Sequence, residues 1–188
     1  MEGGSMRYAI SFLGAVLVAV VAVFVSSVVD PTDSGAATTG GYVTTCGGGK
    51  LYLNAQEKRS LQLHNGARTS RGLRPLCVHP ALTGAARAHS REMMDKDYMS
   101  HNSYSGETAG ARLRRFGYNW RVYGENVGWG SGYKGAPEAR FRAWMNSPGH
   151  RANILNNNFR EVGIGTATGY FGGYGNSTTY TVDFGTRR

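Results

Sequence analysis

Apolar residues gather first in one uninterrupted run, Tyr8–Val29, which carries no charge and is preceded by Arg7. A run of this length can cross a bilayer as a hydrophobic helix, because a spanning helix needs about 20 residues. The small residues that follow would also permit cleavage as a secretory signal peptide. A transmembrane anchor and a cleaved signal both stay open. Either one predicts that the rest of the chain is exported, and Arg7 places the N-terminus in the cytoplasm.

Residues 30–50 are rich in Gly, Thr and Ser and lack apolar periodicity, which is typical of a flexible tether. Helical spacing begins after it. Asn54 followed by Glu57 predicts a capped helix start, and the residues after Pro80 in "ALTGAARAHSREMMDKDYM" repeat at helical spacing. Two shorter amphipathic segments, "GETAGARLRRFG" and "APEARFRAWMNS", predict two more helices. In the second of these, Phe141, Trp144 and Met145 share an apolar face.

Three short runs rich in β-branched and aromatic residues predict strands. They are "WRVYGENVGW", "EVGIGTATGYF" and "TTYTVDFGT", each punctuated by glycine. The last two predict an antiparallel hairpin at the end of the chain. Helices first and a hairpin last indicate an α+β fold with layers around one sheet, formed by residues 54–186.

The formal net charge of +9 favours an anionic partner, such as a cell-envelope polymer or lipid headgroups. The basic residues are scattered singly and no nucleic-acid recognition motif is present, so no nucleic-acid partner is expected. Cys46 and Cys77 both follow the apolar run, and export to an oxidising compartment predicts a disulfide between them. Two unpaired thiols are the alternative.

Candidate chemistry lies where predicted elements begin or end. His101 in "SHNS", Glu125 in "GENV" and His150 in "SPGHRANIL" occupy such boundaries. Ser147 and Pro148 predict a helix start with Ser147 as the N-cap, so His150 falls in the first turn, where the helix dipole favours a neutral ring. Two histidines and one glutamate are a common ligand set for zinc with an open position.

The other histidines have simpler interpretations. His64 and His89 lie within predicted helices beside apolar residues, which predicts partly buried, hydrogen-bonded side chains. His79 precedes a proline in a turn and is expected to be exposed. The chain lacks a Gly-x-Ser-x-Gly elbow, a His-Glu-x-x-His pair, a Walker loop and a dinucleotide fingerprint, which excludes the hydrolase and nucleotide-binding classes that depend on them.

Four motifs in order, "LHNGAR", "SHNS", "GENV" and "AWMNSPGHRANIL", resemble the bacterial branch of the CAP superfamily. This superfamily comprises cysteine-rich secretory proteins, antigen 5 and pathogenesis-related proteins, and the resemblance covers Leu61 to Phe184. It implies an α-β-α sandwich with a central antiparallel sheet, secreted or displayed on the cell surface.

The resemblance also implies a cleft lined by His101, Glu125 and His150 that can hold a divalent cation such as zinc. A second glutamate of the eukaryotic branch has no match, since Ser147 stands near its place. Glu138, one helix segment earlier, is a further candidate for the cleft.

Three functions are compatible with these features. The first is an exported or surface-anchored binding module with a histidine-lined cation site. The second is a metal-assisted peptidase or esterase, in which His101 and His150 polarise a metal-bound water and Glu125 acts as base or ligand. The third is a lipid-binding or sterol-binding protein, which would need an apolar groove. The sequence favours the binding module over the enzyme, because neither a nucleophile elbow nor a specificity pocket can be identified in it.

Overall fold

The computed structural model describes residues 39–188, so the apolar run Tyr8–Val29 lies outside the described residues. A four-stranded sheet in the order β3-β5-β6-β4 forms its centre. Its strands are β3 (Cys77–Val78), β4 (Trp120–Ser131), β5 (Glu161–Phe171) and β6 (Tyr174–Arg187). The three long strands pair antiparallel, as predicted, and the short β3 joins β5 in parallel.

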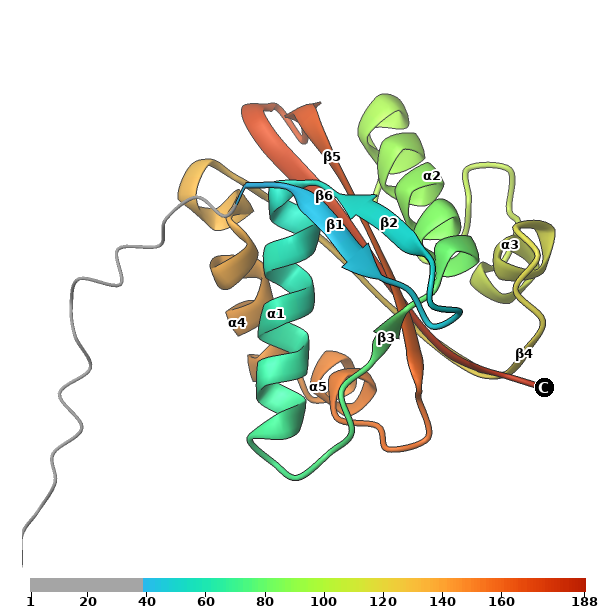
Figure 1. The fold of residues 1–188 in the computed structure, drawn as a ribbon. Helices are drawn as coiled ribbons and strands as arrows, with labels where there is room; N and C mark the ends of the chain where they lie inside the picture. The colour runs from blue at the N-terminus through green and yellow to red at the C-terminus, as the bar shows by residue number, and fades with distance from the viewer. Residues whose placement is uncertain (1–38) are drawn as a thin grey trace, which may run out of the picture. The chain divides into compact units, whose positions relative to one another are not determined.

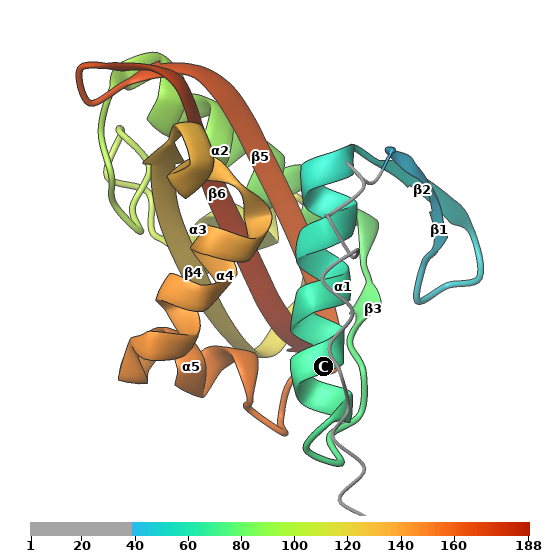
Figure 2. The ribbon, with the colours of Figure 1, turned by 90° about the vertical axis from the view of Figure 1, so that its left-hand side faces the viewer.

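Five α-helices cover the two faces of this sheet. They are α1 (Ala55–Thr69), α2 (Pro80–Lys96), α3 (Ala109–Arg115), α4 (Pro137–Asn146) and α5 (Pro148–Ile154), with a 3-10 turn η1 (Gly132–Gly135) before α4. Helices α1, α4 and α5 lie on one face, and α2 and α3 lie on the other (Figures 1 and 2). The predicted mixed α/β fold is therefore confirmed. None of these helices is long and apolar enough to cross a membrane.

Alternating residues of β5 set how closely each helix layer approaches the sheet. Val162 and Ile164 point into the main core with Trp144, and Phe141 and Met145 of the predicted apolar face pack against this core. The glycines between them face α2. A Cβ atom on Gly163 would lie 2.1 Å from the carbonyl carbon of Leu82, and one on Gly165 would lie 2.2 Å from that of Ala86. The backbone of α2 therefore rests directly on β5.

The first helix begins as predicted. The side chain of Asn54 accepts a hydrogen bond from the backbone N–H of Glu57, and Glu57 accepts one from the backbone N–H of Asn54. Within this helix His64 is fully buried, with Nδ1 2.7 Å from the carbonyl oxygen of Ser60. Burial lowers the pKa of His64 to about 4, so the ring is neutral in the core.

His79 is not exposed, contrary to the expectation from the proline that follows it. It is half-buried at the N-cap of α2, where Nδ1 accepts a hydrogen bond from the backbone N–H of Ala81. Its ring also meets the ring of Tyr118 edge-on, with 4.9 Å between the centroids. The sequence pattern predicts the turn at His79, but it does not show that Tyr118, from a distant segment, covers the ring.

A hairpin occupies part of the segment that was expected to be a tether. Strand β1 (Gly41–Thr44) pairs antiparallel with β2 (Lys50–Leu53), and Cys46 after β1 forms the predicted disulfide with Cys77 of β3. The backbone N–H of Cys46 also donates to the carbonyl oxygen of Val78. The hairpin is thus attached to the edge of the main sheet, and its strands are too short to show an apolar period.

Substitution of Gly165 by alanine tests the close contact between α2 and β5. Because the added methyl group would overlap the backbone of α2, Gly165→Ala should lower the free energy of unfolding by about 3 kcal/mol in urea titrations. Gly66→Ala in α1 is the matched control, since nothing lies within 4 Å of its Cβ position. That variant should be neutral or more stable by up to about 1 kcal/mol. Equal stability of the two variants would contradict the packing described above.

Candidate functional site

Glu125 lies on the edge strand β4, where successive residues face opposite layers of helices. Its side chain lies on the α3 side and is 3% exposed, whereas a Cβ atom on the preceding Gly124 would contact Asn153 of α5. Directly opposite Glu125 in the antiparallel pairing is Asp183 of β6. Glu125 is therefore a buried acidic residue, and the groups that its carboxylate contacts determine the chemistry of the site.

Both carboxylate oxygens of Glu125 are engaged. Oε1 lies 2.8 Å from Nδ1 of His101, and Oε2 accepts a hydrogen bond from the guanidinium of Arg112 on α3. Arg112 is 1% exposed and also donates to the carbonyl oxygen of His101 and to Oγ of Ser103. The buried ion pair thus fixes both the ring and the backbone of His101, which lies in the loop between α2 and α3.

The ring of His101 is 57% exposed and keeps Nε2 as its second nitrogen. The hydrogen bond that His101 donates to Glu125 raises the pKa of His101, and this effect exceeds the opposing effect of partial burial. The preceding residue is held as well, because Nε2 of the buried His89 lies 2.8 Å from the carbonyl oxygen of Ser100. His89 is therefore hydrogen-bonded within a helix as predicted, but it is fully rather than partly buried, and its Nδ1 has no hydrogen-bond partner among the described residues.

Asp183 was not expected from the sequence as part of the site. It is fully buried, and neither carboxyl oxygen has a hydrogen-bond partner within 3.5 Å among the described residues. Burial, followed by the charge of Glu125, raises the pKa of Asp183 well above its ordinary value, so the group is neutral. The one available signal was a charged residue inside the strand-like run "TVDFGT".

His150 lies in the first turn of α5, on the other side of β4. Ser147 and Pro148 begin this helix as predicted, but the Ser147 side chain makes no capping bond to the backbone. Its Oγ lies instead 2.8 Å from Nδ1 of His150. The amide of Asn126 on β4 donates to the carbonyl oxygen of His150, and Asn153 donates to the carbonyl oxygen of Glu125. These bonds tie α5 to the same stretch of β4.

The expected neutral state of His150 agrees with the direction of its pKa. Burial lowers that pKa most, and the charges of His101 and Arg140 lower it further. The charge of His101 thus acts on His150, but among the described residues the ligand atoms of His101, Glu125 and His150 do not all lie within 4.8 Å of one another.

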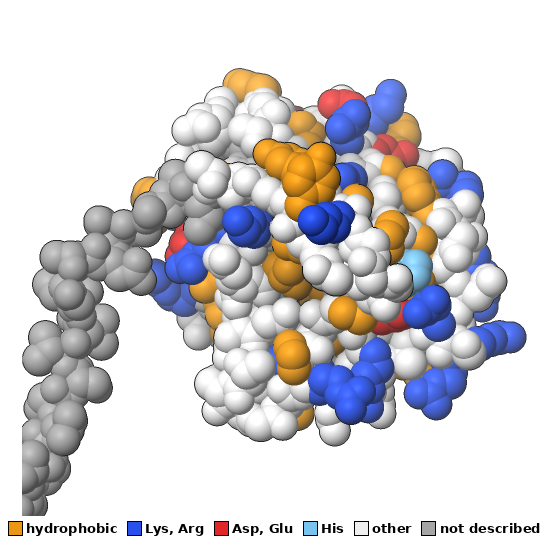
Figure 3. Space-filling model, in the orientation of Figure 1, with side chains coloured by type: hydrophobic (Ala, Val, Ile, Leu, Met, Phe, Trp, Pro, Cys, Tyr) orange, Lys and Arg blue, Asp and Glu red, His pale blue; other side chains and the backbone are white. Residues whose placement is uncertain are grey.

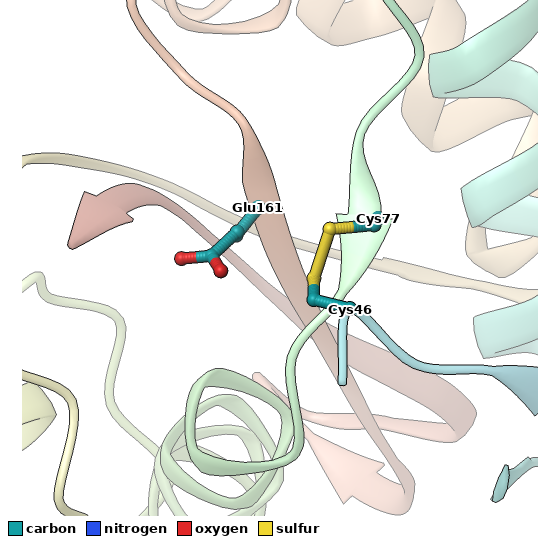
Figure 4. A group of neighbouring side chains, drawn as sticks. All are labelled: Cys46, Cys77 and Glu161. Atoms are coloured by element: carbon teal, nitrogen blue, oxygen red, sulfur yellow. A yellow bond between two sulfur atoms is a disulfide. The ribbon is translucent and has the colours of Figure 1, made fainter. Parts of the chain in front are cut away.

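The remaining candidates lie elsewhere or are already occupied. Glu138 pairs with Arg59 of α1, at 2.6 Å between Oε1 and Nε. Among the described residues, the group of three potential ligands whose atoms lie within 4.8 Å of one another is Cys46, Cys77 and Glu161. Figure 4 shows this group, in which the two sulfurs form the disulfide. Glu161 accepts hydrogen bonds from Tyr118 and Arg187, so this group does not resemble a metal site.

Arg112→Met tests the buried ion pair. Removal of the guanidinium leaves the Glu125 carboxylate buried without a cation, and the free energy of unfolding should fall by about 3–5 kcal/mol. Arg115→Met on the same helix is the control, because Arg115 is 57% exposed where it pairs with Glu107. Its loss should stay below about 1 kcal/mol. Chemical denaturation of both variants measures the difference, and similar losses would show that burial of the Arg112 pair is not decisive.

A family model described as the cysteine-rich secretory protein family (CAP) matches residues 61–184. The chain is 37% identical over 134 residues to the uncharacterized protein YkwD of Bacillus subtilis (strain 168), a match that covers 71% of this chain and 51% of YkwD. It is 31% identical over 122 residues to the uncharacterized membrane protein YlbC of the same organism, covering 65% of this chain and 34% of YlbC.

A solved structure has a similar fold. The chain superposes with a TM-score of 0.61 and 27% identity on an extracellular protein containing an SCP domain from Bacillus anthracis str. Ames, covering 74% of this chain and 47% of that protein. This chain therefore spans about half, or less, of the length of these relatives. From the family match, the identity to YkwD and the shared fold, the chain belongs to the cysteine-rich secretory protein (CAP) family.

Proposed function

We propose that this chain is an exported CAP domain that works as a binding module, and that His101 and His150 hold a divalent cation such as zinc. The observation that carries this proposal is the arrangement of the two rings. Each has Nδ1 next to an oxygen of a neighbouring side chain, Glu125 for His101 and Ser147 for His150. Each therefore keeps Nε2 for a ligand, and neutral imidazole is a preferred zinc ligand.

The role of Glu125 in this proposal is to orient His101. A carboxylate that accepts a hydrogen bond from the distal nitrogen of a histidine is a common arrangement around zinc. Because its other oxygen is bound to Arg112, Glu125 is more suited to this role than to direct ligation. Two protein nitrogens would leave coordination positions for water or for a ligand. A bound cation would supply a Lewis acid at that point.

Binding is favoured over hydrolysis for the same reason. A hydrolase would need a free base near the cation, and the carboxylate that the sequence offers for this role is buried and paired on both oxygens. The third option, binding of a lipid or sterol, remains a prediction from family resemblance.

Export is supported by three observations. The relative from Bacillus anthracis is described as extracellular, the relative YlbC is described as a membrane protein, and Cys46 is joined to Cys77 in a disulfide typical of oxidising compartments. Lys and Arg side chains are spread over the face drawn in Figure 3, where acidic ones are few. We therefore keep anionic cell-envelope polymers or lipid headgroups as the proposed partners, with the N-terminal segment as anchor or signal.

Calorimetry with zinc tests the cation site. The segment to use is 39–188, because it contains the hairpin and both cysteines as well as the sheet. One site is expected at neutral pH, and His101→Ala and His150→Ala should each abolish it. Ser147→Ala should weaken binding by about tenfold, because the ring of His150 loses the group that orients it. Binding should begin to weaken above pH 6.5 as the pH falls, since the raised pKa of His101 lets protons compete early.

His79→Asn is the matched control for these variants. Asparagine can still accept the capping hydrogen bond at the start of α2, so this variant should fold and bind zinc as the parent does. If folded His101→Ala and His150→Ala proteins both bind zinc with parental affinity, the cation site does not exist.

A further inference from the structure

Arg140 is a partly buried cation that forms no ion pair with any carboxylate of the described residues, and its charge lowers the pKa of His150. It lies on α4 and packs against β4 at Gly128, where a Cβ atom would come within 2.8 Å of Cδ and 2.9 Å of Nη1 of Arg140. Trp144, one turn later on the same helix, contacts the same glycine and donates from Nε1 to the carbonyl oxygen of Val127. Arg140 is therefore fixed on the side of β4 that carries α5.

The surroundings of Arg140 do not satisfy its charge. Its Nε is buried and has no hydrogen-bond partner within the described residues 39–188, and no carboxylate in that range pairs with its guanidinium. The Arg140 residue is partly buried, and this burial lowers the pKa of its guanidinium. A desolvated cation without a partner is costly, so its retention calls for an explanation.

Two other inward-facing arginines show how this fold usually satisfies such a group. Arg112 is paired with Glu125 through its terminal nitrogen, although its Nε, like that of Arg140, has no hydrogen-bond partner among the described residues. Arg68 donates to the carbonyl oxygens of Arg74, Ile154 and Asn156. Arg140 has neither kind of partner among the described residues. The difference points to a partner that is not part of this chain.

Among the described residues, the nearby carboxylates are not available to neutralise Arg140. Glu125 is committed to Arg112 and His101, the nearby Asp183 is neutral, and Glu138 is paired with Arg59. Ser147 stands near the place that a second glutamate occupies in the eukaryotic branch, so this position supplies no carboxylate either. Trp144 lies between the segments that carry Arg140 and His150. It follows Arg140 by one helical turn, and its ring centroid lies 6.5 Å from that of His150.

We propose that Arg140 and His150 together bind an oxyanion, the carboxylate or phosphate group of the ligand of this site. The planar guanidinium presents two N–H groups that fit the two oxygens of such a group, and the imidazole supplies a third contact. The proposal rests on the proposed function in that it assigns the ligand class to the same binding site. It does not require the cation, since without it Nε2–H of the neutral His150 ring can donate to the oxyanion, and Arg140 can contact the oxyanion in either case.

The test is a titration of the full chain, purified in nonionic detergent, with inorganic phosphate and separately with acetate, at pH 7 and without zinc. The signals of backbone amides in 15N-labelled protein report both binding and folding. The parent should bind at least one of the two anions with shifts centred on α4 and the start of α5. Arg140→Gln should weaken that binding by about tenfold or more. The affinity of Arg140→Lys should lie between those of the parent and Arg140→Gln, because lysine keeps the positive charge but lacks the paired N–H groups of the guanidinium.

Arg142→Gln on the same helix is the matched control, because Arg142 is exposed and makes no ion pair with a described carboxylate. Its affinity should stay within about twofold of the parent, since a single exposed charge contributes little. The proposal is overturned if neither anion binds, if folded Arg140→Gln binds like the parent, or if Arg142→Gln loses as much. A chain that binds phosphate but no zinc would contradict the cation site and leave the oxyanion site standing.

Discussion

The ion pair between Glu125 and Arg112 is the interaction on which the site depends. Both side chains are buried, and a lone charge at either position would cost several kcal/mol. The pair joins the edge strand β4 to α3 and, through the carbonyl oxygen of His101, to the loop before that helix. Burial raises the pKa of Asp183 most, and the charge of the neighbouring Glu125 raises it further.

The two sides of β4 place their histidines by different means. On the α3 side, an ionic network holds His101 and raises its pKa. On the α5 side, neutral amide hydrogen bonds from Asn126 and Asn153 hold the helix start that carries His150, and its pKa is lowered. One strand thus presents two imidazoles with different proton affinities. The ring with the lower pKa is the one on which the charge of Arg140 acts, where a neutral donor and a cation can share an anionic ligand.

Periodicity in the sequence was sufficient for most of the fold. The capped start of α1, the long amphipathic α2 and the glycine-punctuated β5 are local patterns, and each forms where it was predicted. The hairpin of β1 and β2 was missed because its stability comes from pairing and from the disulfide to a distant strand. His79 was misjudged for the same reason, since the ring that covers it belongs to a segment far along the chain.

For the candidate site, the motifs identified the histidines and Glu125 but not their partners. Arg112 reads as one of several basic residues in an amphipathic helix, and nothing in its spacing shows that it is the buried one. Asp183 becomes part of the site only through the register that sets it opposite Glu125. The lowered pKa of His150 was predicted in direction, but its main cause, burial, depends on how α5 packs.

The most direct test of this account is an NMR titration of the histidine rings in 13C-labelled parent protein without metal. If the buried pair governs the site, the His101 midpoint lies above 6.5, because Glu125 stabilises the charged ring, and the His150 midpoint lies below 6.5. Two midpoints that coincide near 6.5, or a reversed order, would contradict the claim that Glu125 and Arg112 make the two imidazoles unlike.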